Sequence, residues 1–290
     1  MILIADSGST KCDWTLIDQL GNHISSQTTI GINPLNMSQS KIENIIFEIS
    51  EVFEKRNQID KIHFYGAGCG TDTSNQKIKA SFYSIFKNLK LLKIEEDMIA
   101  AVHATTKTPA VIAILGTGSN CCYFDGKKVI QHTPSLGYLL ADEASGNYFG
   151  KELLKSFYFR NMPSSLAIGF KSKFGADLEQ LLYNLYELKR PNAYLASYAI
   201  FLFEHRGHPF IERILHNGIK VFLDNYIMLY AKELQNYPLH FVGSIAYSTQ
   251  DIINKMISER GFSVKSFVKK PIKNLINHIV SNEYPLQKTS

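Results

Sequence analysis

The sequence predicts an α/β protein of two lobes, each a mixed five-stranded sheet with helices on both faces, and a ligand cleft between the lobes. Two observations lead to this prediction. The order β-β-β-α-β-α-β-α runs twice along the 290 residues, and such a repeat is a stronger signal than any single motif. Each copy also opens with an apolar strand that enters a turn of glycine and hydroxyl residues, at 2–11 and at 112–120.

The first lobe is expected to span residues 1–108, and turn and cap signals delimit its elements. The turn 18–22 joins two strands, and Ser40 with Glu43 forms a predicted capping box before a helix rich in isoleucine. Glycines follow the fourth strand at 66–70, and Pro109 marks the boundary. We expect strands at 1–5, 12–17, 24–29, 61–65 and 91–95, and helices at 40–53, 76–88 and 97–106.

The second lobe is expected to span residues 109–290 and to repeat the order. An Asp125-Gly126 hairpin turn separates two of its strands, and a helical insertion rich in Leu, Tyr and Phe interrupts it at about 145–204. Pro209 starts a long helix, and the last helix can pack back on the first lobe. We expect strands at 111–115, 120–124, 128–131, 239–242 and 263–268, and further helices at 209–234, 249–260 and 272–280.

Composition places the chain among ordinary globular proteins, with 45% hydrophobic and 20% charged residues. A net charge of +5 without a Lys/Arg block argues against nucleic acid as a partner. The apolar runs are too short to span a bilayer, so no membrane partner is expected. Met1 leads directly into a strand without a signal-peptide pattern, which predicts a cytoplasmic protein. Four cysteines without C-x-x-C spacing are interpreted as reduced and partly buried: Cys12, Cys69, Cys121 and Cys122.

The two Gly/hydroxyl turns fit a site for Mg²⁺ and polyphosphate. A strand holds Asp6 rigidly, glycine lets the backbone approach phosphate oxygens, and hydroxyl groups offer donors. Asp6 is the candidate Mg²⁺ group and is expected to act through water, because Mg²⁺ keeps part of its hydration shell. Aligning Gly8 with Gly118 also matches the hydroxyl residues on either side, which indicates two phosphate-binding loops. The expected nucleotide-binding residues are Ser7, Gly8, Ser9, Thr10 and Lys11 in the first loop and Gly116, Thr117, Gly118 and Ser119 in the second.

Several further positions combine a structural with a chemical interpretation. Asp97 comes directly after a predicted strand, where it can cap a helix and also take a proton from a hydroxyl in the cleft. Asp142 and Glu143 form an acidic pair that would cap the helix from 144. Asn33 precedes a proline and fits a turn, and the pair 243–244 fits a strand-helix turn.

Four stretches of the chain match a known family at the family's spacing. They are DSGSTK at 6–11, EDMIAA at 96–101 followed by GTGSNC at 116–121, LGYLLADEASG at 136–146, and VGSIA at 242–246. On these stretches, and along nearly its whole length, the chain resembles the N-acetylglucosamine kinase-like family. That family is grouped with the BadF-type ATPases, among the sugar kinases and ATPases with the actin-like (ribonuclease H-like) fold.

The resemblance implies ATP and Mg²⁺ as cofactors and Asp97 as the catalytic base. It implies that the turn formed by Gly243 and Ser244 lets the adenosine approach closely. Two departures leave the substrate in doubt, because the family's Trp is Leu136 here and the glycine of its Gly-Asp-Glu is Ala141. The first departure removes an apolar or stacking face near the sugar. The sugar contacts that the resemblance implies are Asn33, Asp97, Thr117 and Asp142.

We therefore predict an ATP-dependent kinase of an amino sugar, with N-acetylglucosamine or glucosamine as the preferred candidates, that transfers the γ-phosphate to the 6-hydroxyl. The expected partner is this small-molecule amino sugar, and a homodimer is left open. Two alternatives are a BadF-type activator ATPase that couples hydrolysis to a partner enzyme and a non-catalytic sugar-binding sensor. The activators carry an iron–sulfur cluster on cysteines at a dimer interface, and the cysteines here lack that spacing. Asp6 and Asp97 argue against the sensor.

Overall fold

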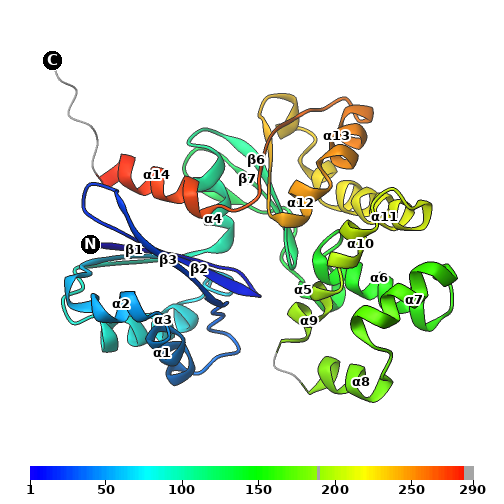
Figure 1. Cartoon of the computed structure of the whole chain (residues 1–290). Helices are drawn as coiled ribbons and strands as arrows, with labels where there is room; N and C mark the ends of the chain where they lie inside the picture. Colours follow the sequence, from blue (N-terminus) through cyan, green and yellow to red (C-terminus); the bar gives the residue numbers. More distant parts are fainter. Residues whose placement is uncertain (188–189, 284–290) are drawn as a thin grey trace. The chain divides into compact units, whose positions relative to one another are not determined.

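The computed structural model describes residues 1–187 and 190–283, which form two compact units (Figure 1). Unit 1 combines Met1–Lys107 with the described part of Lys270–Ser290, and unit 2 is Thr108–Lys269. Each unit contains a five-stranded mixed sheet. The α/β class and the two sheets of the predicted fold are confirmed.

The sheet of unit 1 has the order β3-β2-β1-β4-β5. Its strands are β1 (Ile2–Ser7), β2 (Lys11–Ile17), β3 (His23–Ile30), β4 (Lys61–Gly66) and β5 (Leu91–Glu96). β2 pairs antiparallel with β1 and β3, whereas β1, β4 and β5 run parallel. Parallel neighbours end at the same edge, and ligands of such sheets bind beyond the carboxyl ends of the strands. The register places Ser7, Gly66 and Glu96 side by side at that edge.

Helices cover both faces of this sheet (Figure 1). On one face, α1 (Gln39–Phe47), α2 (Ser50–Glu54) and α3 (Asp72–Ile85) bury a core around Trp14, Phe64 and Phe82. On the other face, α4 (Asp97–Thr105) and α14 (Ile272–Glu283) pack on Ile2 and Ile4. Alternate residues of β1 therefore serve two cores, as expected for a strand that is buried on both faces.

The predicted capping box at Ser40 is wrong. Ser38 is the N-cap of α1, and its hydroxyl accepts a hydrogen bond from the Lys41 amide at 3.3 Å. The Glu43 carboxylate is directed to α3 instead, where it accepts a hydrogen bond from the Ser84 hydroxyl. The single helix expected at 40–53 is also divided, since Ile49 has a non-helical backbone with φ −89° and ψ 82°.

The sheet of unit 2 has the equivalent order β10-β9-β6-β7-β8. Its strands are β6 (Ala110–Leu115), β7 (Ser119–Phe124), β8 (Val129–Ile130), β9 (Leu239–Val242) and β10 (Val264–Val268). β7 and β8 continue the sheet antiparallel to β6, and β9 and β10 run parallel to it. The repeated strand order that the sequence predicts is therefore present in both sheets.

The first hairpins of the two sheets differ in length. β1 and β2 close on the pair Ser7–Cys12, whereas β6 and β7 close on the pair Leu115–Ser119, one residue shorter. Matching the strand ends makes Gly116, not Gly118, the counterpart of Gly8. The sequence alignment of Gly8 with Gly118 is therefore two residues out of structural register.

The helices of unit 2 share one hydrophobic core with a face of its sheet. They are α5 (Gly137–Leu140), α6 (Gly146–Tyr158), α7 (Ser164–Phe174), α8 (Leu178–Tyr186), α9 (Pro191–Ser197), α10 (Ile200–Glu204), α11 (Pro209–Asn225), α12 (Ser244–Ser248) and α13 (Gln250–Glu259). Within the described ranges, no helix is long and apolar enough to cross a membrane.

The helix predicted at 209–234 ends early, at Asn225, and 3₁₀ turns follow. Tertiary contacts explain the change. The Tyr230 hydroxyl donates to the Cys121 carbonyl at 3.1 Å and accepts from the His132 amide at 3.0 Å. These bonds satisfy backbone groups near β7 and fix the chain in a turn, although the local sequence favours a helix.

Candidate active site

The carboxyl edge of the unit 1 sheet brings two predicted site residues together. Asp6 is the penultimate residue of β1, and Asp97 follows β5 directly as the first residue of α4. Between them lies only β4, which ends at Gly66. Asp97 is not the N-cap of its helix, since Glu96 occupies that position. A carboxylate at the first turn still gains from the helix dipole.

Asp6 lies in an environment that disfavours its negative charge. Burial, together with the nearby charges of Asp13 and Asp97, raises the pKa of this carboxyl to about 7, and Lys11 opposes the rise only in part. A carboxylate that is both desolvated and repelled by like charges is stabilised most by a bound cation. Asp6 therefore fits a cation-binding role.

The loop after Asp6 is a tight hairpin with open space beside it. The Gly8 amide donates to the Lys11 carbonyl at 3.0 Å, which leaves residues 9–10 at the tip. A Cβ added at Gly8 would meet only the Lys11 carbonyl oxygen, at 3.9 Å. The packing of the protein does not require glycine here, and the open space leaves room for a ligand to approach the backbone closely. Lys11 Nζ forms an ion pair with Asp13 at 2.6 Å.

The Ser7 side chain serves the fold rather than a ligand. Ser7 is fully buried, and its hydroxyl donates to the Ile32 carbonyl at 3.0 Å and accepts from the Ile32 amide at 2.7 Å. The expectation that this hydroxyl offers a donor to phosphate is therefore wrong. Its bonds instead hold the segment that leads into Asn33 against the end of β1.

The glycine loop 66–70, to which the sequence assigns no role, contacts polar side chains at the same edge of the sheet. The Asn33 amide group lies against Gly68, where a Cβ would displace it, and the Glu96 carboxylate lies against Gly70 in the same way. Asn33 Oδ1 also accepts from the Leu35 amide at 2.9 Å. The loop thus positions Asn33 and adds Glu96 to the candidate site. The alternating glycines at 66, 68 and 70 were the signal for it.

In unit 2, the predicted second loop is bound to the start of α6. The Gly116 amide donates to the Gly118 carbonyl at 2.9 Å. The carbonyls of Gly116 and Thr117 accept from the amides of Gly146 and Asn147, at 2.8 and 3.0 Å. A Cβ at Gly116 would meet no atom within 4 Å. This loop, like the first, has unfilled space at a glycine.

Asp142 lies beneath this loop and supports it. The residue is buried, and its Oδ1 accepts from the Ser119 amide at 3.1 Å while its Oδ2 accepts from Asn147 Nδ2 at 2.8 Å. Burial raises the pKa of the Asp142 carboxyl, and these two hydrogen bonds oppose that rise. Asp142 does not cap α6, because Ser145 is the N-cap. Asn147 is not among the residues predicted for the site, because nothing in its local sequence pattern distinguishes it.

Gly243 joins the same edge of unit 2. It follows β9 with φ +115°, and an added Cβ would collide with the Leu115 carbonyl and approach the Gly116 amide at 3.2 Å. The Gly243-Ser244 turn therefore lies directly beside the second loop. Ser244 begins α12 and is exposed. Two of the predicted nucleotide-binding segments are thus brought together within unit 2.

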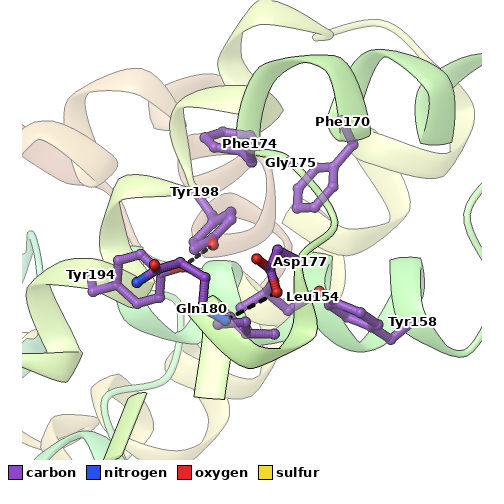
Figure 2. Close-up of a pocket in the computed structure, with 10 residues that line it drawn as sticks. Leu154, Tyr158, Phe170, Phe174, Gly175, Asp177, Gln180, Tyr194 and Tyr198 are labelled. Atoms are coloured by element: carbon purple, nitrogen blue, oxygen red, sulfur yellow. Dashed lines mark hydrogen bonds between the residues drawn. The ribbon is translucent and has the colours of Figure 1, made fainter. Parts of the chain in front are cut away.

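A cavity of about 50 Å³ lies elsewhere, in the helical insertion of unit 2. Figure 2 shows aromatic rings around it, with the hydroxyls of Tyr194 and Tyr198 hydrogen-bonded at 2.6 Å. No residue predicted for the site lines it. The volume accommodates one or two water molecules, so this cavity is too small for a sugar or a nucleotide.

All four cysteines are buried and none of them forms a disulfide, although the sequence predicts only partial burial. Burial raises the pKa of each thiol. A protonated, buried thiol is a poor nucleophile and a poor metal ligand. Among the described residues, no group of three His, Cys, Asp or Glu side chains could hold a metal ion.

Comparisons with known proteins agree with this fold. No family model and no curated protein matches the chain. A crystal structure of a "putative N-acetylglucosamine kinase" from Porphyromonas gingivalis is 31% identical, with a TM-score of 0.89, over 98% of this chain and 100% of that one. A second "putative N-acetylglucosamine kinase", from Chromobacterium violaceum, has a TM-score of 0.70 at 16% identity, over 96% and 98% of the two chains.

A more distant structure shares only the fold. It is a ROK family glucokinase from Streptomyces griseus in complex with glucose and AMPPNP, with a TM-score of 0.59 at 13% identity, over 95% and 97% of the two chains. The fold and the paired glycine loops define an enzyme of the actin-like ATPase class of sugar kinases. The chain belongs to the N-acetylglucosamine kinase-like family of that class. It is accordingly an ATP-dependent sugar kinase.

Proposed function

We propose that the protein phosphorylates an amino sugar, N-acetylglucosamine or glucosamine, at its 6-hydroxyl. The similarity to the Porphyromonas gingivalis protein over the whole length of both chains supports this substrate class. The main support for the proposal is that Asp6 and Asp97 lie near each other at the carboxyl edge of one sheet. Phosphoryl transfer needs one group to offset charge and another to accept a proton.

Asp97 is the proposed catalytic base. A sugar hydroxyl is a poor nucleophile at neutral pH, and a carboxylate that accepts its proton also orients the oxygen. The bond between O6 and the γ-phosphorus forms while the bond from that phosphorus to its bridging oxygen breaks. ADP leaves, and the hydroxyl proton moves to Asp97.

The backbone of the two loops is proposed to bind the phosphates of ATP. The space beside Gly8 and Gly116 gives phosphate oxygens room to approach amide groups. Ser9, Thr10, Lys11, Thr117 and Ser119 belong to the same loops and are proposed as nucleotide contacts with Gly118. Ser7 contributes by holding the loop, as its hydroxyl bonds require. Gly243 and Ser244 are proposed to lie against the adenosine.

Mg²⁺ is proposed to bind at Asp6, whose half-buried and repelled carboxylate fits a cation. When bound, the metal would neutralise phosphate charge. One carboxylate is enough, because Mg²⁺ usually binds through one or two carboxylates, phosphate oxygens and water.

Asn33, Thr117 and Asp142 are proposed to contact the sugar together with Asp97. Asn33 is fixed by the glycine loop. Asp142 already accepts two protein hydrogen bonds, and a carboxylate has about four acceptor positions, so it can also accept from a sugar hydroxyl.

Four other expectations stay predictions from the sequence. They are the division into lobes of residues 1–108 and 109–290, the cleft between these lobes, a homodimer and a cytoplasmic location.

The two alternatives have weaker support. An activator ATPase with a shared cluster needs accessible thiolates, and the thiols here are buried with raised pKa values. A non-catalytic sensor has no need for a carboxylate with its pKa raised to about 7 beside a second acidic residue.

A coupled assay of ADP release tests the proposal. Purified protein receives Mg²⁺-ATP and, in separate wells, N-acetylglucosamine, glucosamine, N-acetylmannosamine, glucose or no sugar. We expect ADP release above the sugar-free rate with the amino sugars, and ³¹P–¹H correlation NMR should place the phosphate on C6. Sugar-independent ADP release would favour the activator. Tight sugar binding without ADP release would favour the sensor.

A further inference from the structure

The junction between the second loop and α6 depends on one buried side chain. Asn147 is fully buried, and its Nδ2 donates to the Thr117 carbonyl and to Asp142 Oδ2, each at 2.8 Å. Its backbone amide donates to the same Thr117 carbonyl at 3.0 Å. Asn147 therefore holds the loop, the helix and the supporting carboxylate together.

These bonds fix the direction of the peptide groups in the loop. In a trans peptide the carbonyl and the following amide point in opposite directions. The carbonyls of Gly116 and Thr117 are bound by α6, so the amides of Thr117 and Gly118 are turned away from that helix. Asp142 in turn holds the Ser119 amide at 3.1 Å.

The junction also contains features that cost stability. Among the described residues, buried Asn147 Oδ1 and Ser119 Oγ have no hydrogen-bond partner. Asp142 and Ala144 have left-handed backbones, with φ of 70° and 57°. Orphaned polar atoms and strained residues persist where function requires a particular geometry. An apolar side chain at position 147 would remove the orphaned Oδ1 but would leave Asp142 Oδ2 without its donor.

We propose that Asn147 is a positioning residue for phosphoryl transfer, whose side-chain amide holds the Gly116–Gly118 loop in the orientation that presents its amides to the ATP phosphates. The inference rests on the proposed function, in which this loop binds those phosphates. Asn147 itself need not touch ATP or sugar. A clamp of this kind acts by fixing geometry, and small misplacements of phosphate-binding groups are costly in rate.

The test compares Asn147→Leu and Asn147→Ala with Ser145→Ala. Leucine has the branched shape of asparagine and the same number of side-chain heavy atoms, so Asn147→Leu keeps the buried space filled if Asn147→Ala fails to fold. Ser145 is the matched control, because it is fully buried at the start of the same helix and its hydroxyl accepts from the Tyr148 amide at 3.2 Å. That cap makes no hydrogen bond to the loop.

The Asn147 variants should raise KM for ATP and lower kcat, so that kcat/KM falls about 10–10²-fold, as for misplaced phosphate-binding groups. In the absence of ligands, hydrogen–deuterium exchange of residues 115–120 should rise in these variants only. Ser145→Ala should lower Tm and leave both readouts at the parental values.

Parental kinetics in a folded Asn147→Leu protein, or an equal kinetic loss in Ser145→Ala, would overturn the proposal. Increased hydrogen–deuterium exchange with parental kinetics would show that Asn147 holds the loop but has no role in phosphoryl transfer, and it would also overturn the proposal. If the parent phosphorylates no sugar, the proposed function fails. Hydrogen–deuterium exchange then tests by itself whether Asn147 holds the loop. Unchanged exchange at residues 115–120 in the Asn147 variants would overturn the proposal.

Discussion

The two glycine loops of this protein occupy equivalent places in two equivalent sheets, yet they are held in different ways. The first loop follows Asp6, whose pKa is raised to about 7 by burial and by neighbouring carboxylates. The second has no acidic residue before it, and α6, Asp142 and Asn147 bind its backbone. The comparison teaches that one topology can supply charge in one unit and oriented backbone groups in the other.

This difference makes the two units respond differently to substitution. Changes at the carboxylates of unit 1 should affect the chemical step and the dependence of stability on pH. Changes at the second loop should affect nucleotide binding and local order. The predictions that follow separate these effects, from the largest to the smallest.

Asp97→Asn should cause the greatest loss. It keeps the size of the side chain but cannot take the hydroxyl proton, so kcat should fall by about 10²–10⁴-fold, the range for loss of a general base. ATP affinity should hardly change, and sugar affinity should fall by roughly 1 kcal/mol for one weakened hydrogen bond. Steady-state kinetics and nucleotide titration measure the two effects separately.

Asp72→Asn is the matched control, because Asp72 is an exposed carboxylate in the first turn of α3. It should keep the parental rate. Loss of ATP binding in Asp97→Asn would instead place Asp97 at the metal. Parental turnover would move the base elsewhere, with Asp142 as the next candidate.

Asp6→Asn should reduce kcat by at least ~10²-fold, because metal positioning supplies several kcal/mol in such transfers. The same substitution should stabilise the protein without nucleotide at pH 8. The folded pKa of about 7 lies above the ordinary 3.8, so the folded state holds this proton more tightly than the unfolded state. The free energy of unfolding therefore falls as pH rises from about 4 to about 7, and it levels off above that range.

In Asp6→Asn this pH-dependent loss is absent, so the variant should be more stable than the parent by about 1–3 kcal/mol at pH 8, with little difference at pH 4. Denaturant unfolding at both pH values measures it. A variant that is less stable than the parent at pH 8 would contradict the buried, repelled state of Asp6.

The glycines give the smallest effects and the most direct comparison of the loops. Gly8→Ala and Gly116→Ala place a methyl group in open space, so stability should change by less than about 0.5 kcal/mol. KM for ATP should nevertheless rise by roughly tenfold, as the methyl occupies space meant for phosphate. The proposed phosphate site at either loop is wrong if its alanine variant keeps the parental KM.

Gly118→Ala is the contrasting case. Its Cβ would lie 2.8 Å from Asp142 Oδ2, so the substitution should destabilise unit 2 by about 1–3 kcal/mol through overpacking. Thermal unfolding of the three alanine variants distinguishes glycines beside open space, Gly8 and Gly116, from Gly118, which is tightly packed against protein atoms. Equal stability of all three would contradict the close contact between the loop and Asp142.

The sequence by itself determined the fold class, the repeated strand order and the glycine loops. These follow from hydrophobic periodicity and from turn residues, which act over a few neighbouring positions. It also identified Asp6 and Asp97, because each lies next to the end of a predicted strand. Local signals failed where longer-range contacts compete, as at Glu43, which bonds to α3, and at Tyr230, which bonds to β7.

Only the tertiary structure decided how the site residues are used. The sequence predicts that Ser7 donates a hydrogen bond to phosphate. In the structure its hydroxyl instead donates to the carbonyl of Ile32, which lies 25 residues away in the chain. Asn147 lies outside every motif, and Glu96 lies in one without an assigned role, so their importance comes from what the fold places against them. Burial, charge repulsion and hydrogen-bond partners depend on segments that are distant in sequence, and no local pattern records them.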